Sequence, residues 1–363
     1  MSGIFGNNIK ISIFGESHGT AIGVTINGLR PGIKLDIDYI EEQMKRRAPG
    51  TSNLTTSRKE KDEFKILSGY FNGRTTGTPL CAIIENSDKH SKDYERTKNL
   101  MRPGHADFTG FVKYNGFNDY RGGGHFSGRI TAPLVFAGSI CRKILEEKGI
   151  FIGSHIKSIG NVQDNFKDKS LFDPVYVKED ILKKLSKSKF PVIDKKSAEE
   201  MKKAIIEAKS DCDSIGGIIE TAIINIPAGV GDPFFDSVES TLSHLLFSVP
   251  AVKGVEFGRG FEIATMRGSS ANDEYYIDEN GNVKTYTNNN GGILGGITNG
   301  MPVFFRTVIK PTASILKEQN TVDIEKKENS KIIIHGRHDP CIVTRAVPVI
   351  EAVSAIAILD MMY

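Results

Sequence analysis

Apolar residues recur along the chain with two spacings, and each spacing predicts a different element. Residues 9–14 alternate between apolar and polar side chains, which is typical of a half-buried strand, and this strand would end at Gly15. Residues 79–85, 215–226 and 301–309 are rich in apolar and β-branched side chains and predict three further strands.

Segments in which apolar residues recur every three or four positions, between capping and stop signals, predict helices. The first predicted helix is capped by Asp36 and stopped by Pro49 and Gly50, and the second covers residues 132–148. A third begins at the capping box at Ser197, and a fourth begins at a similar box at Asp236 and is stopped by Pro250. The last is a buried terminal helix over residues 349–359. Strands and helices do not alternate strictly, so an α+β architecture is favoured over a doubly wound sheet. We find no repeat of fixed period and no linker, so we predict one compact domain over residues 1–363.

Two polar stretches interrupt this pattern. Residues 86–96 predict a mobile loop, for which closure over a site as a lid is one hypothesis. Residues 161–196 are rich in lysine and weakly patterned, so they predict a solvated peripheral segment without chemistry.

Composition narrows the class of protein. The chain has 363 residues, 39% of them hydrophobic, and its 47 Lys and Arg against 44 Asp and Glu give a formal charge of +3. This balance argues against a nucleic-acid or membrane-surface binder. The first residues do not resemble a secretory signal, and no stretch reaches the roughly 18 apolar residues of a membrane span. The four cysteines have no paired spacing, so reduced thiols and a cytoplasmic enzyme are expected.

Histidine or arginine stands beside glycine or proline in four separate clusters. They are residues 15–19 (GESHG), 102–107 (RPGHAD), 121–125 (RGGGH) and 337–341 (RHDPC). Loops rich in Gly and Pro lie at the surface, and such loops on a rigid scaffold carry many binding and catalytic groups. We therefore predict that the clusters form one site for an anionic ligand.

Glycine runs and an arginine pair suggest how this ligand is held, but each has a second interpretation. The triglycine in residues 121–129 has an arginine at each end and predicts an anion-binding nest, with a tight turn as the alternative. Residues 288–297 are also glycine-rich, and both ligand contact and a surface hairpin fit them. Arg46 and Arg47 close a predicted helix, where a solvated helix end is as good an interpretation as an anion site.

Proton transfer is the chemistry that the histidines suggest. His18 and His105 are the candidates, because imidazole can give and take protons near neutral pH. Asp339 is a third candidate, and a salt bridge that holds its loop is the alternative. A metal site is a rival hypothesis, with candidate ligands His335, His338, Asp339 and Cys341. The arginines near these histidines favour phosphate or carboxylate ligands, so no metal is predicted.

Five segments resemble, in order, the signatures of the chorismate synthase family. They are residues 14–19 (FGESHG), 102–107 (RPGHAD), 119–124 (DYRGGG), 252–256 (VKGVE) and 336–341 (GRHDPC). The resemblance runs from the N-terminus nearly to the end of the chain. It implies a sandwich of antiparallel sheets with helices between them, assembled as a homotetramer.

The resemblance also implies a reaction. A trans-1,4-elimination of phosphate from 5-enolpyruvylshikimate 3-phosphate gives chorismate, in the shikimate pathway to the aromatic amino acids. The hydrogen lost from the ring is not acidic, so an ordinary base would face a high barrier. The family therefore requires reduced FMN although no net oxidation occurs, and NADPH is a candidate reductant of this flavin.

Residue roles follow by similarity. His18 would protonate the departing phosphate, His105 would protonate the flavin near N1, and Asp339 would help to remove the proton gained at N5. The implied flavin contacts are His125, Phe126, Ser127, Pro250, Ala251, Gly295, Lys310, Pro311, Thr312, Ala313, Ser314 and Arg337. The implied contacts to anions of the substrate or of NADP are Arg47, Arg121, Arg129 and Arg345.

The chain departs from the family pattern at three positions. Asn53 replaces the next family arginine after Arg47, which weakens the hypothesis of a nicotinamide site. Thr344 stands where proline commonly precedes the arginine matched by Arg345, and Ala48 stands where many relatives have a third arginine. The alternative class is a non-catalytic flavin or phosphate binder, which would need the glycines and arginines but not the three proton-transfer groups together.

Overall fold

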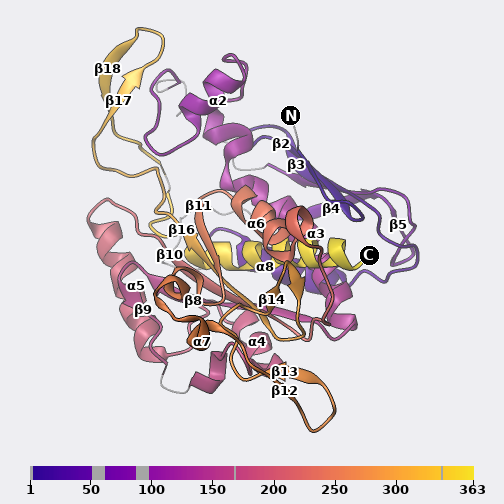
Figure 1. The fold of residues 1–363 in the computed structure, drawn as a ribbon. Coiled ribbons are helices and arrows are strands. Elements are labelled where there is room, and N and C mark those ends of the chain that lie inside the picture. The colour runs from indigo at the N-terminus through magenta and orange to yellow at the C-terminus, as the bar shows by residue number, and fades with distance from the viewer. Residues whose placement is uncertain (1–2, 51–61, 87–97, 167–168, 337) are drawn as a thin grey trace.

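The computed structural model describes residues 3–50, 62–86, 98–166, 169–336 and 338–363. Two five-stranded sheets form the outer layers, and the longest helices lie between them (Figure 1). Helix α3 (Thr131–Glu147) packs on one sheet, helix α8 (Val343–Met362) packs on the other, and the two helices contact each other. This arrangement confirms the predicted α+β sandwich.

The first sheet has the order β1-β2-β3-β7-β4, and all its strand pairs are antiparallel. Its strands are β1 (Ile4–Phe5), β2 (Lys10–Gly15), β3 (Ala21–Asn27), β7 (Leu80–Glu85) and β4 (Phe64–Ser68). The strands predicted at residues 9–14 and 79–85 are therefore confirmed. Because β2 ends at Gly15, the turn with Ser17 and His18 begins at the end of this strand.

The second sheet is also antiparallel, with the order β11-β16-β10-β8-β9. Its strands are β11 (Val252–Phe257), β16 (Val303–Ile309), β10 (Gly217–Ile224), β8 (Phe151–Ile159) and β9 (Val162–Gln163). The predicted strands at residues 215–226 and 301–309 are confirmed. Four hairpins complete the strands: β5 (Tyr70–Phe71) with β6 (Arg74–Thr75), β12 (Tyr275–Ile277) with β13 (Val283–Thr285), β14 (Ile293–Leu294) with β15 (Ile297–Thr298), and β17 (Gln319–Asp323) with β18 (Glu328–Ile332).

The remaining helices are α1 (Ile37–Arg47), α2 (Asp107–Lys113), α4 (Glu179–Ser186), α5 (Lys195–Ser210), α6 (Val238–Ser248) and the short α7 (Gly268–Ala271). Helices α1 and α6 contact the central pair, whereas α4 and α5 pack against β8 and β9 of the second sheet. Short 3₁₀ segments are η2 (Arg121–Phe126), η3 (Gly128–Ile130), η4 (Lys169–Phe172), η5 (Phe234–Asp236) and η6 (Gly260–Thr265). Among the described residues, none of the helices combines the length and the apolar character that crossing a bilayer requires.

Close packing of α3 against α8 forms the centre of the core. Both helices are buried on nearly every side, which is why their sequences are apolar around the whole circumference. Gly138 lets the helices approach, since a Cβ atom at this position would overlap the backbone and side chain of Ala352. Each fully buried Val or Ile side chain here contributes about 1.5–3 kcal/mol to folding.

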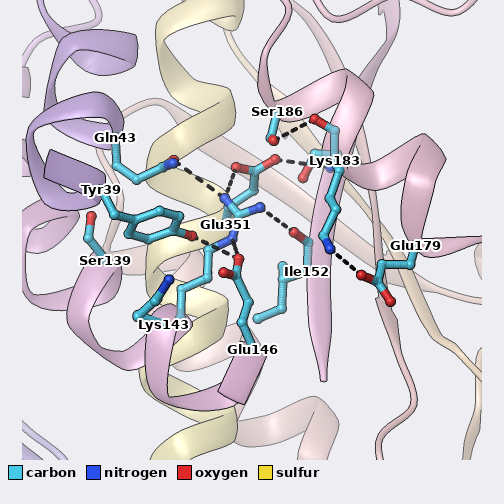
Figure 2. Close-up of polar contacts among 12 residues, drawn as sticks. Tyr39, Gln43, Ser139, Lys143, Glu146, Ile152, Glu179, Lys183, Ser186 and Glu351 are labelled. Atoms are coloured by element: carbon cyan, nitrogen blue, oxygen red, sulfur yellow. Dashed lines mark hydrogen bonds and ion pairs between the residues drawn. The ribbon is translucent and has the colours of Figure 1, made fainter. Parts of the chain in front are cut away.

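A buried polar network around Glu351 joins the helices to the second sheet, and Figure 2 labels Glu351 together with Gln43 of α1 and Ile152 of β8. The Glu351 carboxylate of α8 accepts hydrogen bonds from Arg46 of α1 at 2.6 Å, from Arg142 of α3 at 2.8 Å and from the backbone N–H of Ser154 in β8 at 3.0 Å. Burial alone would raise the pKa of Glu351, but the two arginines outweigh burial and hold it below its usual range. The ionised carboxylate thus fixes α1, α3 and α8 relative to one another.

Two helix starts differ from the capping boxes found in the sequence. Helix α5 is capped by Asp194, whose carboxylate accepts the Ser197 N–H at 2.7 Å, so Ser197 lies inside the first turn. Helix α6 is capped by Ser237, which accepts the Ser240 N–H at 3.0 Å, and not by Asp236. In each case two capping residues lie close together, and local sequence does not decide between them.

Two further predictions need correction. The terminal helix begins at Val343 and not near residue 349, because the core packing of α8 tolerates Pro348 and the backbone hydrogen bond that proline cannot make. The prediction of a solvated segment over residues 161–196 is wrong, since α4 packs on β8 with Leu182 and Leu185 buried. Because α4 also carries lysines on its outer face, the composition of the segment did not indicate that its other face is buried.

Candidate active site

Residues from all four histidine and arginine clusters line one cavity of about 1250 Å³. The predicted site residues in its walls are His18, His105, Asp339, His125, Phe126, Ser127, Pro250, Ala251, Lys310, Pro311, Thr312, Ala313, Ser314, Arg47, Arg129 and Arg345. The cavity is large enough for two small ligands side by side, since a typical site for one ligand measures about 300–1,000 Å³.

Two of the predicted site residues that the structure describes, Arg121 and Gly295, do not line the cavity. The Arg121 side chain turns to Asp119, to which its Nε and Nη2 donate at 2.8 Å each, and Asp119 raises the pKa of this guanidinium. Gly295 lies in the tight turn between β14 and β15 with a φ of 63°, so the second glycine run forms a hairpin. Arg337 lies outside the described residues.

The turn after β2 places His18 at the cavity. Ser17 is fully buried beside it, and its hydroxyl lies 3.1 Å from His18 Nδ1 and 3.1 Å from the Gly122 carbonyl oxygen. The hydroxyl has one proton, so when it donates to the carbonyl it must accept from Nδ1. Ser17 therefore orients the imidazole and links it to the triglycine segment.

His105 is held by a carboxylate and an arginine of its own motif. Its Nδ1 lies 2.9 Å from Asp107 Oδ1, and Arg102 donates to the same carboxylate through Nε and Nη2 at 2.7 Å each. Burial alone would raise the pKa of Asp107, but the hydrogen bonds from Arg102 and His105 outweigh it and hold the pKa well below its usual range. The ionised carboxylate favours a proton on Nδ1, which makes Nε2 the atom that can exchange one.

The triglycine segment makes room for both histidines. Gly122, Gly123 and Gly124 have φ values of 60°, 85° and 52°, a region that other residues rarely adopt. A Cβ atom on Gly122 would overlap the His18 ring, and one on Gly123 would lie 2.7 Å from His105 Cε1. The glycines thus bring the two imidazoles to neighbouring positions, which the sequence interpretation as an anion nest did not anticipate.

Asp339 and Arg345 form another part of the cavity wall. Arg345, in the first turn of α8, donates through Nη1 to the Asp339 carboxylate and through Nε to the Arg47 carbonyl oxygen at 3.0 Å. The salt bridge that was the alternative interpretation of Asp339 is therefore present, and it holds the carboxylate at the cavity wall.

The arginine pair at the end of α1 is not a solvated helix end, since Arg47 is buried and Arg46 is half-buried. Arg46 turns to Glu351, whereas Arg47, only 2% exposed, turns to the cavity and donates to Asp62. Arg129 donates to the same Asp62 carboxylate and, through Nε, to Asn86 at 3.0 Å. Asn86 is the one described residue of the predicted loop over residues 86–96; the rest lies outside the described residues.

Three chain segments form the wall predicted to hold flavin. His125 donates through Nδ1 to the Gly15 carbonyl oxygen at 2.8 Å, and the Lys310 N–H donates to the Ala251 carbonyl oxygen at 2.9 Å. The Thr312 hydroxyl is buried and has no hydrogen-bond partner among the described residues. A wall with apolar surface, a lysine and an unsatisfied hydroxyl fits an aromatic ring system with polar edges.

The rival metal hypothesis gains no support from the geometry. Across the described ranges, no group of three or more His, Cys, Asp or Glu residues is placed to hold a metal ion. Burial raises the pKa of the Cys341 thiol to about 12, so it is not the thiolate that a metal would require.

Comparisons with known proteins identify the family. The chorismate synthase family profile matches residues 9–363. The chain is 44% identical to the chorismate synthase of Dehalococcoides mccartyi over 361 residues, covering 99% of this chain and 96% of that protein. It is 45% identical to that of Pyrococcus abyssi over 356 residues, covering 98% and 96%.

A solved structure agrees with these relatives. A crystal structure of a chorismate synthase superposes with a TM-score of 0.77 at 30% identity, over 99% of this chain and 92% of that chain. The chain therefore belongs to the chorismate synthase family, which forms chorismate in the shikimate pathway by eliminating phosphate from 5-enolpyruvylshikimate 3-phosphate.

Proposed function

We propose that the cavity holds 5-enolpyruvylshikimate 3-phosphate beside reduced FMN, and that His18, His105 and Asp339 perform its proton transfers. The observation that carries this proposal is the placement of both imidazoles against Gly122 and Gly123 in one cavity with Asp339. A protein that only bound flavin or phosphate would not need three proton-transfer groups around one ligand.

The family implies reduced FMN, and the residues of the wall fit it. Residues 125–127, 250–251 and 310–314 supply apolar surface, hydroxyls and the Lys310 cation. Reduced FMN, when bound, supplies electron density to the substrate and recovers it, so the elimination has no net oxidation. The protein groups bind and orient the ligands and move the protons.

Arg47, Arg129 and Arg345 are proposed to bind the anionic groups of the substrate. Guanidinium groups bind phosphate and carboxylate in a planar, two-pronged geometry, and low exposure strengthens these contacts. His18 would then deliver a proton to the departing phosphate, which lowers the charge that the leaving group must carry.

His105 and Asp339 are proposed to serve the flavin. Asp107 holds His105 Nδ1, so we assign proton exchange with the flavin to Nε2, close to Gly123. Asp339, fixed by Arg345, would accept the proton gained at flavin N5. Because both groups are positioned by partners from the protein itself, little reorganisation is needed during the reaction.

Arg47 is better suited to the substrate than to NADPH. Its guanidinium is buried and fixed by Asp62, and the family arginine that would accompany it on NADPH is replaced by Asn53, which lies outside the described residues. We therefore propose that a separate reductant supplies the reduced flavin.

Assembly as a homotetramer stays a prediction of the resemblance.

Anaerobic phosphate release tests the proposal. The protein is mixed with 5-enolpyruvylshikimate 3-phosphate and chemically reduced FMN, and phosphate and chorismate are measured together. We expect equal amounts of both products with reduced FMN and neither with oxidised FMN. Flavin binding without either product would favour the non-catalytic binder instead.

A further inference from the structure

Asp62 belongs to none of the motifs in the sequence, yet its side chain binds two of the arginines of the site, Arg47 and Arg129. It precedes β4, and its carboxylate is fully buried. Its φ is 53°, a left-handed conformation that Asp, Asn and Gly adopt more readily than other residues. The position thus combines a buried charge with an unusual backbone, and it needs an explanation.

Each carboxylate oxygen of Asp62 binds a different arginine. Oδ2 accepts from Arg47 Nε at 2.9 Å and from Arg47 Nη2 at 2.6 Å, whereas Oδ1 accepts from Arg129 Nη1. Arg47 ends α1 and Arg129 lies in η3 just before α3, so one side chain fixes two guanidiniums that come from separate elements. Both arginines also line the cavity.

Charge explains why a carboxylate is needed. Arg47, Arg129 and Arg345 lie together, and like charges in a buried site repel strongly. Burial alone would raise the pKa of Asp62, but Arg47 and Arg129 outweigh burial and lower it, so the carboxylate is ionised. Among these described side chains, Asp62 and Asp339 are the counter-charges, so three cations and two anions leave one positive charge, which still attracts an anion.

We infer that Asp62 is a positioning residue of the substrate-binding site: it fixes Arg47 and Arg129 in the orientation that receives an anionic group of the substrate, without touching the substrate itself. The inference rests on the proposed function of these arginines. Two other roles make different predictions. If Asp62 only stabilised the fold, its replacement would not alter substrate affinity. If Asp62 only reduced the positive charge of the site, its replacement would strengthen anion binding.

Asp62→Asn separates these roles. Asparagine tolerates the same backbone conformation, but it has one acceptor oxygen and an NH₂ group that would face the second arginine. We expect the dissociation constant of 5-enolpyruvylshikimate 3-phosphate, measured by calorimetry on flavin-free protein, to rise about 10- to 100-fold. KM should rise by a similar factor, with kcat changed much less. Wild-type or tighter binding would overturn the inference.

Two further variants separate geometry from charge and from folding. Asp62→Glu keeps the charge and moves it by one methylene, so positioning predicts weakened binding, whereas a pure charge effect predicts wild-type affinity. Asp62→Gly keeps the backbone conformation and removes the carboxylate. If Asp62→Asn does not fold, Asp62→Gly provides the test. We expect formate, a small carboxylate, to restore substrate binding to this variant. Binding of substrate to Asp62→Gly at wild-type affinity without formate would contradict the inference.

Asp36→Asn is the matched control. Asp36 caps the other end of α1, and asparagine caps helices as well as aspartate does, so substrate affinity should not change. Phosphate release by the wild-type protein distinguishes a failure of the proposed function from a failure of the role given to Asp62. If it releases no phosphate with substrate and reduced FMN, the proposed function fails; if it is active and Asp62→Asn binds substrate normally, only the role of Asp62 fails.

Discussion

At the scale of single residues, the site depends on glycines as much as on charged groups. Gly122 and Gly123 let two imidazoles approach one stretch of backbone, and Ser17 and Asp107 then orient those rings. The orienting contacts come from the protein itself, which is the arrangement that makes a general acid or base effective.

Gly122→Ala tests this arrangement. The new methyl group would overlap the His18 ring and displace it, so we expect kcat/KM for phosphate release to fall by about 10²–10⁴-fold, the usual contribution of a general acid. The matched control is Gly73→Ala. Gly73 has a similar positive φ of 79°, but a Cβ atom there would meet no atom within 4 Å. Both variants should lose about 1–2 kcal/mol of stability to backbone strain, and only Gly122→Ala should lose activity. Equal activities would contradict the steric role.

At the scale of elements, buried ion pairs join the layers of the sandwich. Glu351 connects α1, α3, α8 and β8, and His155 performs a similar role in the second sheet. His155 of β8 lies with Nδ1 2.9 Å from Asp164 and Nε2 2.9 Å from Glu220 of β10, while Lys157 lies 3.7 Å from the Glu220 carboxylate. The imidazole is hydrogen-bonded through both ring nitrogens and thus links β8, β10 and the segment that leads to α4.

This cluster gives stability a defined dependence on pH. Burial alone would lower the pKa of His155, but the two carboxylates outweigh burial and raise it above its usual value near 6.5. The folded state therefore binds a proton that the unfolded chain releases. The resulting stability is fully present below about pH 6.5 and is lost as the pH rises through the raised pKa.

Thermal midpoints measured from pH 6 to pH 9 test this dependence. The wild-type midpoint should fall as the pH rises. His155→Gln should have a lower midpoint at pH 6, because two carboxylates lose their shared cation, and a flatter profile above it. A variant profile parallel to that of the wild type would show that another group causes the alkaline decline.

At the scale of the whole molecule, the sandwich brings distant loops to one cavity. Apolar periodicity predicts several of the longer strands and helices, whereas the layers of the sandwich and the roles given to His18, His105 and Asp339 follow from motifs that resemble the family. Local competition between capping residues, as at Asp194 and Ser197, shifted predicted boundaries.

Two functional contacts show what the sequence could and could not predict. Asp107 stands two residues after His105, so an aspartate beside a candidate histidine was a usable signal. Asp62 is 15 residues from Arg47 and 67 from Arg129, and no local pattern joins them. Such a contact arises only when β4, α1 and η3 pack together, and packing of this kind cannot be read from periodicity.

The central claim is that His105 and Asp339 transfer protons in a cavity shared with reduced FMN. Anaerobic rapid mixing of His105→Ala and Asp339→Ala with substrate and reduced FMN, followed by phosphate detection, tests it most directly, with FMN affinity measured in parallel. His244→Ala is the control, since His244 lines the same cavity and packs against Phe5. We predict near wild-type FMN affinity and rates about 10²–10⁴-fold lower for the two variants, and a wild-type rate for the control. Wild-type rates in His105→Ala and Asp339→Ala would contradict it.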